Sequence, residues 1–149
     1  EIGSGLVGSE MCIRDSDNIG GDCTNFVSQC IYEGSKVMNH AETFGWYYYS
    51  ANKKSPSWTG VEYLFNFLTK NSGIGPYGNV CSKEDIEQGD IIQLSFDGNN
   101  FAHSLFVVDK VLSNIWIATH TFDAYYKNLN DYNYQKIRFL HIDGIRKLS

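Results

Sequence analysis

The sequence has few positive charges for its length. Lys and Arg together number 12 in 149 residues, against 17 Asp and Glu, and the formal net charge is −5. Affinity for nucleic acid comes largely from clustered Lys and Arg, so this shortage argues against a nucleic-acid partner. The chain also lacks an apolar run long enough to cross a bilayer, so no membrane span is predicted.

The cysteines lack the spacing of a metal site or a disulfide framework. No two of the four form a CxxC pair, and no zinc-finger pattern is present. One bridge is conceivable in a secreted protein. His40 and His141 have no cysteine or carboxylate at ligand spacing, and we interpret both as structural. We therefore expect no metal and no cofactor.

The first residues lack the features of an export signal. Residues 1–16 have no positively charged start that leads into an apolar core. We interpret 1–16 as a non-native or disordered segment and 17–149 as a single domain, which is long enough to bury a core without disulfides. No internal repeat is visible.

What the sequence does contain is a cysteine where a helix is expected to begin. Cys23 follows the Gly20-Gly21 break, and the next apolar residues have helical spacing up to Gly34. The amides and the positive dipole end of a helix start favour the thiolate over the thiol. Cys23 is therefore our candidate nucleophile, whereas Cys30, on the same helix face, is interpreted as a small buried hydrophobic residue.

A candidate base lies in the second half of the chain. His103 stands at the start of a strand-like run, Leu105 to Val108. A cysteine and a histidine that are distant in sequence but adjacent in the fold are what a thiol hydrolase needs.

The remaining pattern predicts a second helix followed by antiparallel strands. We read 40–57 as a long loop, Thr59 as the cap of a helix that ends at 71–73, and 74–80 as a connection. Strands are predicted at 90–96, 102–111, 114–121, 136–142 and 145–148. The order of helices and then strands favours an α+β fold with an antiparallel sheet.

The predicted hairpin also gives a candidate for a third catalytic group. If its turn centres between Val111 and Leu112, His103 lies opposite His120, close enough for one imidazole to orient the other. Asp123 competes for this role if the strand runs further, and a carboxylate would hold the imidazolium more strongly.

Five ordered blocks resemble the putative amidase domain family of bacteria. They are Gly21-Asp22-Cys23-Thr24-Asn25-Phe26-Val27-Ser28-Gln29, Ser57-Trp58-Thr59-Gly60-Val61, Gly89-Asp90-Ile91-Ile92-Gln93-Leu94, His103-Ser104 and His120-Thr121. The resemblance runs from about Asp17 to Ile145. It implies a papain-like fold, in which the nucleophile helix packs on a central antiparallel sheet, as in the related CHAP-type and NlpC-type cell-wall hydrolases. It also implies a secreted or cell-envelope enzyme that cleaves amide bonds in peptidoglycan or related peptides.

The residue patterns and the resemblance together predict roles for several residues. Cys23, His103 and His120 would act as nucleophile, base and orienter, and the backbone amide of Cys23 would hold the oxyanion. The candidate substrate-binding residues are Asp22, Asn25, Gln29, Trp58 and Ser104. Trp58 can either pack under the sheet or stand on the wall of a groove, and the sequence leaves this open.

Two other functions fit the same residues. An acyltransferase would pass the thioester to an amine or a lipid alcohol instead of water. A catalytically silent module would keep the groove only for attachment to the cell wall, although the presence of both Cys23 and His103 argues against this reading. The sequence does not predict an oligomeric state.

Overall fold

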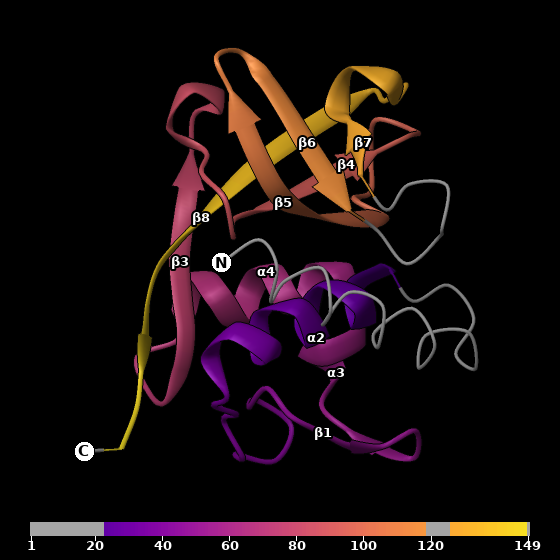
Figure 1. Ribbon diagram of the computed structural model, residues 1–149. Coiled ribbons are helices and arrows are strands. Elements are labelled where there is room, and N and C mark those ends of the chain that lie inside the picture. The colour runs from indigo at the N-terminus through magenta and orange to yellow at the C-terminus, as the bar shows by residue number, and fades with distance from the viewer. Residues whose placement is uncertain (1–22, 119–125, 149) are drawn as a thin grey trace.

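Three helices lie together on one side of a six-stranded antiparallel sheet (Figure 1). The computed structural model describes residues 23–118 and 126–148. The helices are α2 (Cys23–Ser35), α3 (Pro56–Thr59) and α4 (Val61–Lys70), with two short 3-10 turns, η1 (Lys83–Asp85) and η3 (Leu129–Asp131). None of the helices in these ranges is long and apolar enough to cross a membrane.

The strands form one large sheet and one small hairpin. The hairpin pairs β1 (Tyr48–Ser50) with β2 (Lys53–Lys54). The large sheet has the order β3-β8-β4-β5-β6-β7. Its strands are β3 (Gly75–Cys81), β4 (Ile91–Ser95), β5 (His103–Val111), β6 (Asn114–Ala118), β7 (Lys127–Asn128) and β8 (Lys136–Arg146). The α+β class and the antiparallel sheet predicted from the sequence are confirmed.

Alternate residues of the central strands face two separate apolar clusters. Ile91 of β4 packs with Phe26 of α2 in the cluster between the sheet and the helices. Ile92 and Leu94 point to the other face, where Ile86 and other side chains close a second cluster. This alternation follows from the two-residue period of a strand, and it explains why β4 is buried along its whole length.

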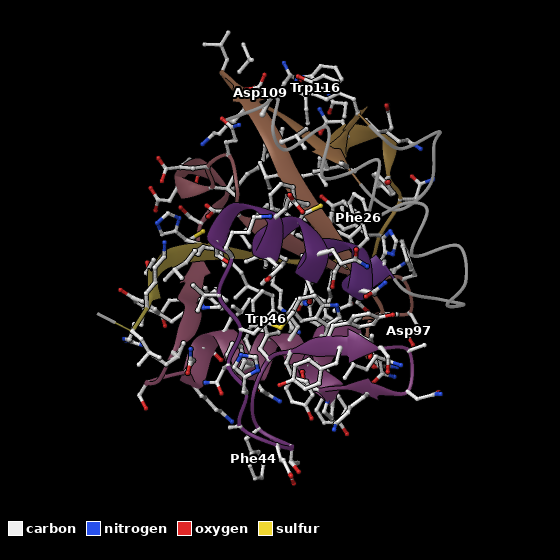
Figure 2. The ribbon with its side chains drawn as sticks, turned by 60° about the horizontal axis from the view of Figure 1, so that its bottom comes forward. Phe26, Phe44, Trp46, Asp97, Asp109 and Trp116 are labelled. Atoms are coloured by element: carbon white, nitrogen blue, oxygen red, sulfur yellow. The ribbon has the colours of Figure 1, made fainter. Side chains whose placement is uncertain are left out.

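The loop predicted at 40–57 has more structure than expected. It contains the small hairpin, the first residues of α3 and a fully buried side chain, Trp46. Figure 2 shows Trp46 in the interior and Phe44 projecting from the end of the molecule, where its side chain is exposed. The expected cap of the second helix was displaced by one residue, because Thr59 ends α3 and Gly60 precedes α4.

The connection predicted at 74–80 is in fact a strand. Strand β3 pairs with β8 from Gly75 opposite Arg146 to Cys81 opposite Phe139. It lies at the edge of the sheet, where the missing N–H of Pro76 does not break a ladder. The two separate strands expected at 136–142 and 145–148 are one strand, β8, with a change of register between Tyr77 and Gly78 of its partner.

Candidate functional site

Cys23 is the first residue of α2, as its position after a glycine pair predicted. Its side chain is buried, with 6% of the residue exposed. Helix α2 packs against β5, so the helix start lies over the sheet. The amide groups of the first helical turn have no partner within the helix and favour negative charge at this end.

The sulfur of Cys23 lies against the backbone at the beginning of β5. The N–H of Ser104 donates to Sγ at 3.3 Å, and the carbonyl oxygen of Ala102 lies 3.9 Å from it. These two residues flank His103. An N–H donor directed at sulfur stabilises a thiolate more than a thiol.

His103 is half-buried at the start of β5, opposite Leu94 of β4. Its ring is near two aromatic rings, with its centroid 6.0 Å from that of Phe96 and 6.2 Å from that of Tyr132. Burial, with a smaller contribution from Asp131, raises the pKa of Tyr132 to about 12. The phenol therefore keeps its proton around neutral pH.

A row of polar side chains lies beneath the Cys23 end of α2. Thr24 Oγ1 is 2.9 Å from Ser104 Oγ, and Gln93 Nε2 donates to Ser104 Oγ at 3.2 Å. Arg138 donates to Gln93 Oε1 from Nε at 2.8 Å and from Nη2 at 2.6 Å. Thr24, Gln93 and Ser104 are fully buried.

Asn25 and Trp58 lie in the interior and are hydrogen-bonded to each other. Trp58 Nε1 donates to Asn25 Oδ1 at 2.9 Å, and Asn25 is fully buried. The indole of Trp58 packs against that of Trp46, with ring centroids 4.5 Å apart and the rings tilted by 33°. Of the two possibilities left open for Trp58, the structure therefore places it in the core and not on a groove wall.

Gln29 and Ser104 complete the predicted substrate-binding residues in the described part of the chain. Gln29 Nε2 is buried and has no hydrogen-bond partner among the residues that the structure describes. Ser104 is fully buried between Thr24 and Gln93. The side chain of Ser104 therefore bonds to other residues of the protein, as that of Asn25 does to Trp58.

The hairpin register differs from the one that the sequence predicted. Val111 pairs with Asn114, so the turn centres between Leu112 and Ser113, and a bulge between Val107 and Asp109 shifts the pairing again. The argument that placed His120 opposite His103 therefore fails. His120, its rival Asp123, and Asp22 lie outside the described residues.

Sequence reasoning missed the partners of His141. Its Nδ1 lies 2.8 Å from Asp90 Oδ2, and its neighbours include Glu87 Oε2 at 3.8 Å. The sequence spacing around His141 gave no sign of these carboxylates, because it is the pairing of β8 with β4 that brings the start of β4 to His141. The hydrogen bond to Asp90 is the main reason that the pKa of His141 is raised, and burial opposes it.

The three groups Glu87, Asp90 and His141 have the atom types of a metal site, with ligand atoms within 4.8 Å of one another. However, the buried carboxylate of Asp90 already accepts the N–H groups of Glu87 at 2.8 Å and Ile142 at 2.9 Å. We therefore interpret Asp90 as a structural residue, as the sequence suggested. An open cleft of about 810 Å³ lies beside His141, lined by η1 and β3, and neither Cys23 nor His103 contributes to it.

Comparison with known proteins identifies a family. A family model described as "Putative amidase domain" matches residues 10–142. The chain is also similar to the uncharacterized protein YhbB of Bacillus subtilis (strain 168), with 29% identity over 110 residues. This alignment covers 72% of the chain and 35% of YhbB, so the chain spans about a third of that relative. No solved structure matches.

Proposed function

Because the chain belongs to the putative amidase domain family, we propose that it is a cysteine-dependent amide hydrolase with a papain-like arrangement. Cys23 is the nucleophile and His103 is the general base. The observation that carries this proposal is the position of the Cys23 sulfur. It lies at a helix start, and the backbone on both sides of His103 contacts it.

The proposed reaction has two stages. His103 takes the thiol proton, the thiolate attacks the amide carbonyl, and the backbone N–H of Cys23 stabilises the oxyanion. His103 then returns the proton to the leaving amine, and a thioester remains on Cys23. Water attacks the thioester with help from His103, which releases the acid and restores the thiol.

A third group would orient the imidazole of His103. The last block of the family resemblance, His120-Thr121, supports His120 in this role, and Asp123 is the alternative. The substrate that we propose is peptidoglycan or a related cell-wall peptide, cleaved outside the cell or in its envelope. This rests on the resemblance to cell-wall hydrolases and on the low positive charge, which does not suit a polyanionic substrate.

The experiment is an assay of amine release from purified bacterial cell-wall sacculi. We expect the wild-type protein to release new amino groups, and Cys23→Ala and His103→Ala to reduce the rate by about 10²-fold or more. Cys30→Ala is the matched control, because Cys30 is buried in the same helix and has no role in the reaction. Release that persists in Cys23→Ala, or is lost equally in Cys30→Ala, would contradict the proposal.

A further inference from the structure

The polar side chains beneath Cys23 form a row across three strands. Arg138 of β8 pairs with Gln93 of β4, and Gln93 pairs with Ser104 of β5. Thr24, the second residue of α2, contacts Ser104 from above the sheet. We call this set the Arg138 chain. Its members are Arg138, Gln93, Ser104 and Thr24.

The direction of the hydrogen bonds in the Arg138 chain is fixed at Gln93. A guanidinium only donates, so the amide oxygen of Gln93 must face Arg138. A carbonyl oxygen only accepts, and Gln93 Nε2 lies 3.1 Å from the carbonyl oxygen of Val61. Two independent partners therefore give the same orientation, in which Nε2 donates to Ser104 Oγ.

The row continues from Ser104 to the sulfur. Ser104 Oγ accepts from Gln93 and lies 2.9 Å from Thr24 Oγ1, and Thr24 Oγ1 lies 3.9 Å from Cys23 Sγ. A thiolate can only accept, so when Cys23 is ionised the hydroxyl of Thr24 donates to the sulfur and Ser104 donates to Thr24. With Cys23 in this state, all the donors in the row point from the guanidinium toward the sulfur.

Arg138 is held firmly at the outer end of the row. Its guanidinium lies between the rings of Phe65 and Phe101, 3.7 and 4.0 Å from their centroids. Nη2 also bonds to Glu62 at 3.2 Å, on the more exposed side. Hydrogen bonds in a buried row polarise one another, so a cation at one end strengthens donation at the other.

We propose that the Arg138 chain positions the Cys23 thiolate and stabilises it. Thr24 donates to the sulfur directly, and Arg138 acts through Gln93 and Ser104 as a positioning residue. The inference rests on the proposed function, because a stabilised thiolate serves a reaction only if Cys23 is the nucleophile. It adds a charged group from β8 to a site built from α2 and β5.

Ionisable groups near Cys23 could also change its pKa, so the variants that are compared must keep them. Helix α2 is packed by β5 and α3. Strand β5 carries His103 at its start and Asp109 and Lys110 toward its other end, and α3 carries none. Every variant below keeps these groups, so a difference between variants reports on the Arg138 chain.

The test is the pH dependence of Cys23 alkylation by iodoacetamide. The product is located by peptide fragmentation that separates Cys23 from Cys30. We expect Thr24→Val, which keeps the shape and removes the hydroxyl, to slow alkylation about fivefold below the midpoint and to leave the high-pH plateau unchanged. Thr24→Ser restores the wild-type profile. Arg138→Met slows alkylation in the same direction by about twofold.

Two comparisons separate positioning from general destabilisation. Ser28→Ala removes a buried hydroxyl of α2 that bonds to Trp58 and Trp46, so it costs stability without touching the Arg138 chain. We expect its alkylation profile to match the wild type. In a double-mutant cycle, Arg138→Met has no further effect once Thr24→Val is present, because both act through one row.

The two proposals fail in different ways. A Thr24→Val profile that superimposes on the wild type, or effects of Thr24→Val and Arg138→Met that add, would overturn the role of the Arg138 chain. The proposed function is judged instead by the wild-type midpoint, which should lie well below the value of about 8.5 for a free thiol.

Discussion

Two buried polar residues, Asp90 just before β4 and Gln93 in its middle, have different roles. The carboxylate of Asp90 accepts hydrogen bonds from two backbone N–H groups and is hydrogen-bonded to Nδ1 of His141. The bonds to Ile142 and His141 connect the start of β4 to β8. Gln93, inside the strand, connects Arg138 to the row that ends at Cys23. Asp90 therefore serves the fold, and we assign Gln93 to the site.

His141 gives a pH dependence of stability that can be worked out in sign. The hydrogen bond to Asp90 raises its pKa, burial acts in the opposite direction, and the nearby Asp143 and Glu87 add to the increase. The folded pKa therefore lies above the unfolded value of about 6.5. The protonated ring stabilises the fold fully below the unfolded pKa, and this contribution is lost as pH rises through the folded pKa.

The measurement is the free energy of unfolding in urea between pH 5.5 and pH 9, for the wild type and His141→Gln. We expect the wild type to be the more stable at low pH and its advantage to shrink as the pH rises. Asp143→Asn should reduce the pH dependence only in part, since Asp143 Oδ1 lies 3.8 Å from the ring. Parallel curves for wild type and His141→Gln would mean that the Asp90 contact does not hold a proton.

At the scale of elements, β3 shows why composition alone misled. Its sequence, GPYGNVC, contains two glycines and a proline and looks like a connection. Only the long antiparallel pairing with β8, some sixty residues later in the chain, makes it a strand. Strands β4 and β5 and helix α4 were predictable because their own apolar periodicity marks them.

Gly78 of β3 has no room for a side chain against the backbone of β8. A Cβ at this position would lie 2.0 Å from the carbonyl oxygen of His141, which is backbone and cannot move aside. We expect Gly78→Ala to cost about 3 kcal/mol of unfolding free energy, because the two strands must separate. Gly34→Ala is the matched control, since nothing lies within 4 Å of its Cβ and it is in a helix.

Urea unfolding of both variants checks this expectation. Gly34→Ala should be neutral or gain about 0.5 kcal/mol from the better helix propensity of Ala. A Gly78→Ala protein as stable as Gly34→Ala would show that the β3–β8 pairing is looser than the structure describes.

At the scale of the whole molecule, the sheet joins the helix layer to the second apolar cluster. Ile91 packs toward α2, whereas Ile92 and Leu105 face the other side. Residues that are far apart in the sequence lie close together where the strands pair. The candidate site is formed in this way, from the start of α2 and the start of β5. Cys23 and His103 could be proposed from the sequence because each has a local signal, a helix start and a strand start.

The Arg138 chain could not be predicted in the same way. Gln93 interrupts the apolar run Ile91-Ile92-Gln93-Leu94, which signals a buried polar residue, but nothing in the sequence indicates its partner. Arg138 reaches Gln93 only because β8 inserts between β3 and β4 in the sheet. The hairpin register failed because the turn centres one residue later than expected, between Leu112 and Ser113, and the bulge in β5 does not restore the predicted pairing.

The central claim is that Cys23 and His103 form a thiolate–imidazole pair. The most direct test is the rate of iodoacetamide modification of Cys23 against pH, in the wild type and in His103→Ala, with Cys23→Ser as the blank. The account predicts an apparent pKa well below the roughly 8.5 of a free thiol, and a return toward that value in His103→Ala. A wild-type Cys23 that titrates as an ordinary thiol in the folded protein, or a shift of the same size in His103→Ala as in the wild type, would contradict it.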